Sequence, residues 1–256
     1  MSKVYPLAKV DTRVIGQGVT DLWRIQVGAY GKRFKDSGWQ AWVTANEYVC
    51  ATLGTLIGLP VPPFAMLEKR NAGVRESLWF ASLSYLKEGE NLPPVNPAQA
   101  YAELPKICAG VIVFDLWIGN TDRYEKNLSF DPNTVPKRLN VFDHGHALFG
   151  IEGASRLAKL RDRFTLTDVA ESGANQHCLM NVLEDFSQLE NWINRIKALP
   201  NFQIVEACRN ALEMKLIDDD EMKLLLDFLL HRRSLLRDLL HANSSKFPSL
   251  KTLTLF

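Results

Sequence analysis

The chain of 256 residues has the composition of an ordinary globular protein, with 46% hydrophobic and 23% charged residues. Its net charge of +1 gives no electrostatic reason to expect nucleic acid or an acidic membrane as a partner. The longest apolar runs are too short to span a bilayer, and no signal-peptide pattern follows the initial methionine. The four cysteines lack CxxC spacing, so we expect free thiols and a cytoplasmic location.

The first third of the chain predicts a small sheet with one helix. Alternating residues in 10–33 predict two strands, broken at Gly16-Gln17-Gly18. Gly16 and Gly18 could present backbone amides to an anion, although a lone Gly-x-Gly is more often an ordinary hairpin turn. A helix is predicted over residues 38–58, followed by strands over 64–68 and 78–83.

Turn-forming residues follow these strands and indicate a link between two parts of the chain. The stretch 85–94 is rich in glycine, asparagine, glutamate and proline. We therefore place a boundary near residue 88, which divides the chain into a lobe of residues 1–88 and a lobe of residues 89–256. The second lobe is predicted to be mainly helical, with helices over 109–118, 186–198, 202–214 and 220–242.

A group of polar residues follows the apolar helix of residues 109–118. Asp122 precedes Asn127 by five residues, and Asp143 ends a later apolar stretch. Short strands predicted over 127–130 and 139–142 would form a hairpin, which would bring Asn127 and Asp143 to one end of a sheet.

These three residues have the chemistry that transfer of a phosphoryl group requires. Mg²⁺ prefers oxygen ligands and is held by few protein groups together with phosphate oxygens. Asn127 and Asp143 could supply such oxygens, and Asp122 could accept the proton of an acceptor hydroxyl. The spacing therefore predicts an ATP- and magnesium-dependent phosphotransferase. Each residue alone could be a cap or a turn former, and a zinc site at His144 and His146 lacks further ligands.

The chain resembles the HipA-like kinases over about residues 10–245, with a more distant likeness to type II phosphatidylinositol 4-kinases. The motifs that carry the resemblance are Asn46-Glu47, Gly58-Leu59-Pro60-Val61-Pro62-Pro63, Gly119-Asn120-Thr121-Asp122-Arg123 and Phe142-Asp143-His144-Gly145. The resemblance implies an α+β, two-lobed kinase fold. A small N-terminal lobe with an antiparallel sheet would grip ATP, and a mainly helical lobe would carry the catalytic loop.

The resemblance also assigns roles to matching residues. Asp122 would be the catalytic base, Asn127 and Asp143 the magnesium ligands, and Glu47 the partner of a lysine that grips phosphate. Aligning Phe34 with the family pattern puts Arg33 where the lysine is expected. Lys32 or Lys35 would then serve only with a one-residue adjustment, such as a bulge at Gly31.

Two further assignments concern the cleft. By position, adenine is expected to lie against Tyr85 and Leu86, where backbone groups would make the hydrogen bonds. Arg123 is expected to hold the catalytic base or a neighbouring segment by an ion pair, although a surface arginine is an equal alternative.

The expected activity is transfer of the γ-phosphate of ATP to a hydroxyl, most plausibly on a protein serine or threonine. A protein substrate and an antitoxin or regulatory protein are the expected partners, as the resemblance implies. One alternative is a nucleotide-binding pseudokinase that acts as an interaction module. Another is a kinase of a small molecule or lipid headgroup.

Overall fold

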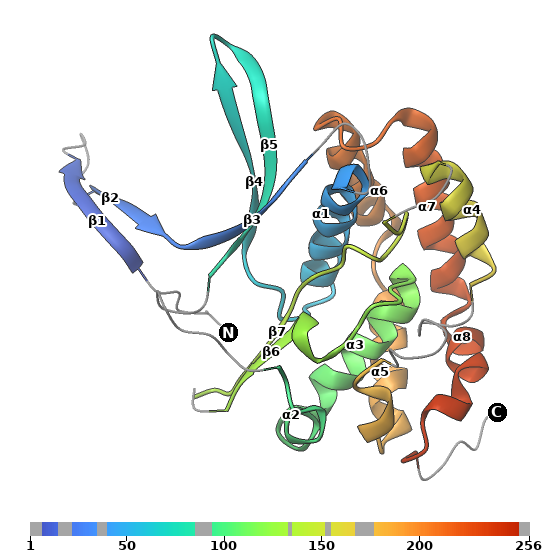
Figure 1. Ribbon diagram of the computed structural model, residues 1–256. Coiled ribbons are helices and arrows are strands. Elements are labelled where there is room, and N and C mark those ends of the chain that lie inside the picture. The colour runs from blue at the N-terminus through green and yellow to red at the C-terminus, as the bar shows by residue number, and fades with distance from the viewer. Residues whose placement is uncertain are drawn as a thin grey trace.

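The computed structural model describes residues 7–14, 22–34, 40–84, 94–132, 135–151, 155–166 and 177–250 (Figure 1). The strands are β1 (Leu7–Val14), β2 (Leu22–Val27), β3 (Ala29–Arg33), β4 (Phe64–Asn71), β5 (Val74–Leu83), β6 (Leu128–Asp131) and β7 (Arg138–Val141). The α-helices are α1 (Gln40–Leu56), α2 (Pro97–Glu103), α3 (Pro105–Ile118), α4 (Arg156–Phe164), α5 (Phe186–Lys197), α6 (Asn201–Glu213), α7 (Asp219–Ser234) and α8 (Leu236–Ala242). Short 3₁₀ turns cover Glu125–Asn127, Met180–Val182 and Ser244–Lys246.

The N-terminal strands form two separate antiparallel sheets. Strands β1 and β2 pair with each other, whereas β3, β5 and β4 form a three-stranded sheet in that order. The β4–β5 hairpin projects from the body of the molecule, and α1 lies between this sheet and the C-terminal helices (Figure 1). The tight turn of the β4–β5 hairpin places Ala72 and Gly73 at φ of 48° and 82°. Positive φ at both central residues is the geometry that matches the twist of a two-residue hairpin.

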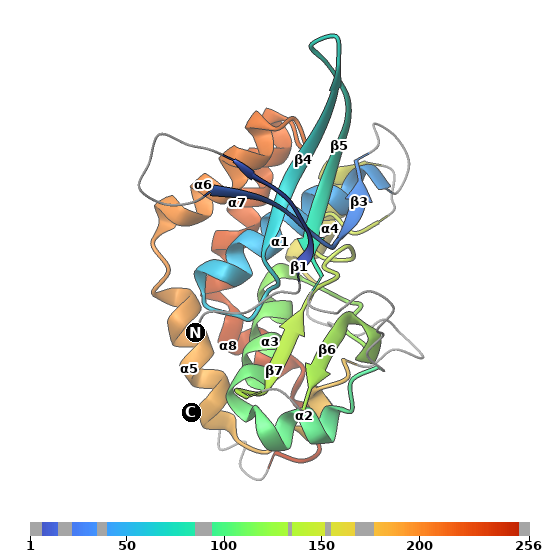
Figure 2. The same cartoon turned by 90° about the vertical axis from the view of Figure 1, so that its left-hand side faces the viewer.

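Helix α3 is the centre of the C-terminal part. All its residues from Cys108 to Ile118 are buried, because α5, α7 and α8 pack around it (Figure 2). The indole nitrogen of Trp117 donates a hydrogen bond to Leu229 O on α7. A helix that is apolar on every side is expected to be enclosed by other elements, and this one is.

The β6–β7 hairpin lies below the three-stranded sheet and beside α3 (Figure 1). Its antiparallel ladder runs from the Leu128–Val141 pair to the Asp131–Arg138 pair. The residues just outside the first pair, Asn127 and Phe142, are therefore neighbours. The hairpin predicted from the sequence is confirmed, and its strands lie within one residue of the expected bounds.

The prediction of one continuous helix over 220–242 is wrong in one respect. The structure has two helices there, α7 and α8, with a break at Leu235. The Leu235 N–H bonds to both His231 O and Arg232 O, and its φ and ψ of −91° and 6° end the helix. The Ser234 hydroxyl also donates to His231 O, so it competes for a carbonyl of the last turn. The boundary near residue 88 and the Gly16–Gly18 turn lie outside the described residues. Among the described helices, none has the length and apolar character that crossing a bilayer requires.

Gly110 on α3 provides a test of how tightly this core is packed. A methyl group there would overlap the Trp192 ring of α5, and that ring is fixed because its nitrogen donates to Lys106 O at 2.6 Å. We expect Gly110→Ala to lower the free energy of unfolding by about 1–3 kcal/mol, since overpacking outweighs the better helix propensity of alanine.

The measurement is urea unfolding followed by circular dichroism. Gly28→Ala is the matched control, because a Cβ at Gly28 would meet only Ser84 Cβ at 3.4 Å. Equal stability of the two variants would show that the α3–α5 contact tolerates a further methyl group.

Candidate active site

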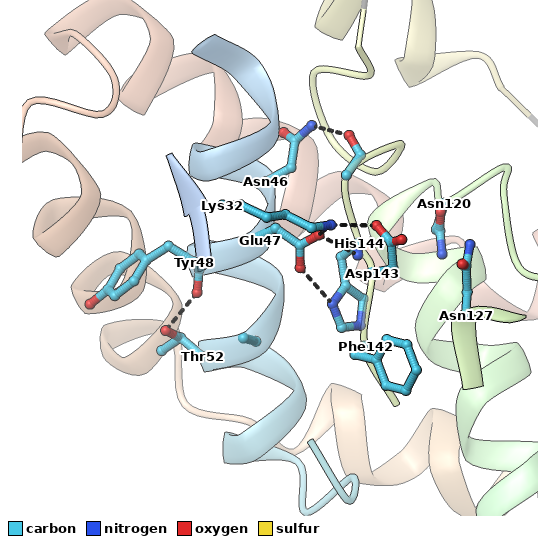
Figure 3. Close-up of polar contacts among 12 residues, drawn as sticks. Lys32, Asn46, Glu47, Tyr48, Thr52, Asn120, Asn127, Phe142, Asp143 and His144 are labelled. Atoms are coloured by element: carbon cyan, nitrogen blue, oxygen red, sulfur yellow. Dashed lines mark hydrogen bonds and ion pairs between the residues drawn. The ribbon is translucent and has the colours of Figure 1, made fainter. Parts of the chain in front are cut away.

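Lys32 on β3 lies between two carboxylates that come from different parts of the chain. Its ammonium nitrogen is 2.5 Å from Glu47 Oε1 on α1 and 2.6 Å from Asp143 Oδ1, which follows β7 (Figure 3). Burial acts against the charged form, but the charges of Glu47 and Asp143 raise the pKa of Lys32. Lys32 is therefore held as a cation between these two groups.

The structure corrects the expected alignment of this strand. The β3–β5 ladder runs from Ala29 to Arg33 without a register shift, so the one-residue adjustment that Lys32 was expected to need, such as a bulge at Gly31, is absent. Because side chains alternate along a strand, Arg33 faces the opposite side from Lys32 and lies over the Trp79 ring, 5.8 Å from its centroid. Lys32 thus meets Glu47 without any adjustment, and Lys35 lies outside the described residues.

Glu47 is buried on α1 and accepts more than one hydrogen bond. Its Oε1 accepts the backbone N–H of His144 at 3.0 Å in addition to the Lys32 ammonium. Burial alone would raise the pKa of this carboxyl, but the charge of Lys32 and the hydrogen bond from His144 hold it well below its usual range. Glu47 is therefore ionised, and it fixes both Lys32 and the backbone that follows Asp143.

Asn46, the neighbour of Glu47, holds the segment beyond Asp143. Its side-chain nitrogen donates to Gly145 O at 2.7 Å and to Gly150 O at 2.9 Å, and its oxygen accepts from Phe149 N at 3.3 Å. The sequence had marked Asn46 only as part of a family motif, without a role. The feature of the sequence that could have indicated this role is the pair of consecutive polar residues, Asn46 and Glu47, within a mainly apolar helix.

The loop after α3 brings Asp122 and Asn127 together. Gly119 ends α3 in the left-handed region with φ of 63°, a conformation in which glycine is favoured. The Asn127 side-chain nitrogen then donates to Asp122 O at 2.6 Å and to Asp122 Oδ2 at 3.2 Å. His146 Nε2 lies 3.7 Å from the same Asp122 oxygen. The two residues that the sequence singled out are thus in direct contact.

Arg123 is fully buried and does not lie on the surface. Its guanidinium donates to Asp115 Oδ2 at 2.8 Å and to Asp115 Oδ1 at 3.1 Å on α3. It also donates to the backbone oxygens of Asn127 and Phe142 at 2.7 and 2.6 Å. Arg123 therefore ties together α3, the start of β6 and the residue that precedes Asp143.

Asp115 is the functional residue that sequence reasoning missed. Besides Arg123, it accepts a hydrogen bond from the Asn120 amide at 2.9 Å and lies 3.1 Å from His177 Nε2. Burial opposes ionisation, but the Arg123 charge and the hydrogen bonds from His177 and Arg123 hold the pKa of Asp115 well below its usual range. Its signal in the sequence was a single acid within an otherwise apolar helix.

Two cavities meet at Lys32 and Asp143. The first, of about 600 Å³, lies between β3, β5, α1 and β6, and its lining includes Phe80, Ser82 and Leu128. The second, of about 590 Å³, is lined by Asp122 and His146 among others. Gly31, Lys32 and Asp143 line both cavities, so this pair of charges separates a larger apolar chamber from the side where Asp122 lies.

The first cavity also contains polar groups that have no partner within the described part of the chain. Ser129 Oγ and His144 Nε2 are buried and make no hydrogen bond among these residues. Unsatisfied buried polar atoms are costly, so they favour a ligand or water that can pair with them. The predicted adenine contacts Tyr85 and Leu86, and the loop residues Gly16 and Gly18, lie outside the described residues.

The donor set at Asp143 fits a hard cation that is bound together with phosphate. Asn127 uses its amide nitrogen to bind Asp122, which leaves its side-chain oxygen as an available acceptor. Asp143 adopts φ of 58°, a left-handed conformation that aspartate tolerates better than most residues. Within the described ranges, no group of three or more His, Cys, Asp or Glu side chains could hold a metal alone. Two oxygen ligands completed by phosphate and water are the arrangement that Mg²⁺ usually has.

Comparisons with known proteins agree with this geometry. A sequence profile described as HipA-like kinase matches residues 33–152, which include Glu47, Asp122, Asn127 and Asp143. The chain is therefore similar to the HipA-like kinases over residues 33–152. A search of curated proteins found no match.

The structure was also compared with solved structures. The proinflammatory kinase CtkA of Helicobacter pylori is similar with a TM-score of 0.58 and 14% identity, over 94% of this chain and 96% of CtkA. HipA of Shewanella oneidensis MR-1, solved with HipB and operator DNA, has a TM-score of 0.45 and 13% identity, over 96% of this chain and 66% of HipA. The match to CtkA confirms the predicted α+β kinase fold, and together the family match and the fold support a kinase-type phosphotransferase.

The Asp115–Arg123 ion pair can be tested through stability. Asp115→Asn keeps the shape of the side chain but leaves the Arg123 charge buried without a counterion. We expect the free energy of unfolding at pH 7 to fall by about 3–5 kcal/mol. Denaturant unfolding measures this loss. The exposed Asp227→Asn serves as a control and should change stability by less than about 0.5 kcal/mol.

The same pair predicts a pH dependence. Because the pKa of Asp115 is lower in the folded state, its contribution to stability is complete above the unfolded pKa of about 3.9 and is lost as pH falls. The stability difference between wild type and Asp115→Asn should therefore shrink below about pH 4. A difference that stays constant from pH 7 to about pH 3 would contradict the assignment.

Proposed function

We propose that this protein transfers the γ-phosphate of ATP to a hydroxyl acceptor in a magnesium-dependent reaction. The observation that carries the proposal is the position of Lys32, whose ammonium joins Glu47 and Asp143 where the two cavities meet. A cation fixed at such a junction can stabilise the charge that develops on a phosphoryl group as it moves from one side to the other.

The first cavity is the proposed nucleotide site. Its walls are mainly apolar, which suits a flat base, and Lys32 at its inner end suits the phosphates. Glu47 would hold the Lys32 ammonium in place, because it is ionised and itself fixed by His144 N.

Asn127 and Asp143 are the proposed magnesium ligands. Bound there, Mg²⁺ would neutralise negative charge on the phosphates. Arg123 fixes the spacing between these residues, since one guanidinium nitrogen binds the backbone oxygens of both Asn127 and Phe142. Arg123 is therefore a positioning residue in this proposal.

Asp122 is the proposed acceptor of the hydroxyl proton. It lines the second cavity, and the Asn127 amide orients its carboxylate at 3.2 Å. In this position it would align the attacking oxygen and take its proton as the new bond to phosphorus forms. From the family resemblance we propose that the acceptor hydroxyl belongs to a serine or threonine of a protein. The same resemblance supports a division of the chain into lobes of residues 1–88 and 89–256. An antitoxin-like or regulatory partner stays a prediction.

Of the two alternatives, the pseudokinase hypothesis has lost its main support. The pseudokinase hypothesis depended on arginine in place of the phosphate-gripping lysine, whereas Lys32 contacts Glu47 directly. A kinase of a small molecule or lipid headgroup uses the same site geometry and differs only in the acceptor. Turnover on a metabolite or inositol lipid, with no transfer to any polypeptide, would favour that alternative.

Transfer from labelled ATP tests the proposal. We expect Mg²⁺-dependent transfer by the wild type and a loss of about 10²–10⁴-fold in kcat for Asp122→Ala, because the proton acceptor is gone. Lys32→Met should lose about 10²–10³-fold, because the phosphate charge is no longer stabilised. Lys197→Met, at the far end of α5, is the matched control and should leave kcat unchanged.

The outcomes separate the two main hypotheses. If wild type and Asp122→Ala are equally inert while isothermal titration shows that ATP binds, the enzymatic proposal is wrong and the pseudokinase hypothesis is supported. If no ATP binds, the assignment of the first cavity is wrong as well.

A further inference from the structure

A hollow of about 470 Å³ adjoins the acceptor side of the site and carries an excess of positive charge. Among the described residues, its lining includes the cationic Arg33, Arg75 and Lys215 and one acid, Glu76. Arg33 also lines the cavity that contains Asp122, so the two hollows meet at its side chain. We call the surface formed by Arg33, Arg75 and Lys215 the basic groove.

Arg33 is held in position by an aromatic platform. Its guanidinium lies over the Trp79 ring, and the Trp79 nitrogen donates to Ser77 Oγ at 3.0 Å. The ring passes so close to Gly31 that a Cβ there would lie 3.2 Å from Trp79 Cε3. Trp79 is therefore fixed across β3, and it presents Arg33 at the edge of the Asp122 cavity.

Arg75 and Lys215 of the basic groove come from two different parts of the fold, the β4–β5 hairpin and the turn after α6. Arg75 on the β4–β5 hairpin donates to Met214 O at 2.9 Å, just after α6, where the chain turns toward α7 (Figure 1). Lys215 follows in the left-handed region with φ of 59° and is exposed. This contact fixes the hairpin and the turn as the two walls of the groove.

The charges of the groove are only partly neutralised by the protein. Glu76 pairs with Lys69 at 2.8 Å, and Glu68 pairs with both Arg70 and Arg75. Within the part of the chain that the structure describes, Arg33 and Lys215 form no ion pair. The groove therefore offers the cations of Arg33 and Lys215 to an external anion.

We propose that the basic groove binds an acidic segment of a polypeptide whose serine or threonine enters the Asp122 cavity. This inference rests on the proposed function, and it specifies the class of acceptor. A polypeptide suits the shape, because the two hollows continue from Asp122 to Lys215 and an extended chain advances roughly 3.3 Å per residue. Acidic side chains suit the charge, and exposed charges of opposite sign steer and align such partners.

The surroundings of Asp122 restrict where the acidic residues can lie. Asp122 and Asp143 both line the acceptor cavity, so a carboxylate next to the accepting hydroxyl would be repelled. The basic groove shares Arg33 with this cavity, whereas Lys215 lines the groove alone. The preference for Asp or Glu should therefore begin about two or more residues from the accepting hydroxyl and on one side of it.

Peptide kinetics test the proposal. The probes are 13-residue peptides with a central serine, whose flanking residues are Asp/Glu, Asn/Gln or Lys. We expect KM to be about tenfold lower for the acidic peptide than for the neutral one at low salt, and the difference to shrink at high salt. Arg33→Glu and Lys215→Glu should each raise KM for the acidic peptide about fivefold and lower it for the lysine peptide.

The controls separate a charge effect from a general loss of folding. Lys197→Glu reverses an exposed charge at the end of α5 and should leave the peptide preference unchanged. Each variant must also melt within a few degrees of the wild type by circular dichroism. A variant that is equally impaired on acidic, neutral and lysine peptides would contradict a role for that residue in charge recognition.

A direct binding measurement keeps this inference separate from the proposed function. Fluorescence anisotropy of a labelled acidic peptide with alanine in place of serine should show binding that Lys215→Glu weakens, whether or not phosphate is transferred. Binding without any transfer would support the groove and overturn the proposed function. Transfer without charge preference, or transfer only to a small anionic metabolite, would overturn the groove.

Discussion

The buried ion pair between Arg123 and Asp115 determines how the parts of the site are arranged. Both side chains are completely enclosed, so each depends on the other for its charge to be tolerated. The remaining guanidinium hydrogen bonds go to the backbone before β6 and after β7, and the remaining carboxylate contacts go to Asn120 and His177. A single buried pair thus sets the separation between Asp143 and the loop that follows α3.

The body of the protein positions α3 by similar means. Arg232 on α7 is buried and donates to the backbone oxygens of Leu116 and Trp117, in the last turn of α3. Burial and the nearby Arg163 lower the pKa of Arg232 to about 10, so it stays charged at neutral pH. Arg163 on α4 reaches Gly119 O. Cations at the carboxyl end of a helix are favoured by its dipole, and here they also anchor the loop that follows.

The sequence predicted the elements and the polar residues wherever the decisive information was local. Asp122, Asn127 and Asp143 lie within 22 residues, and the turn between two apolar strands was enough to bring two of them together. The choice between Lys32 and Arg33 was not local, because it depends on which face of β3 meets α1, and pairing with β5 determines that. Asp115 and Asn46 were missed for the same reason. Their partners come from other elements, and only packing shows that these polar side chains are enclosed.

In the proposed function, the contact between Lys32 and Asp143 would couple the binding of the metal and the nucleotide. One oxygen of Asp143 is already bonded to the lysine, so a divalent cation that arrives alone must compete with an ammonium for it. A polyphosphate that arrives at the same time offers the lysine other anionic oxygens and leaves the carboxylate to the metal. Each ligand therefore raises the affinity for the other, and thermodynamic linkage requires the effect to be reciprocal. On this proposal, the metal and the nucleotide would enter the site as one complex.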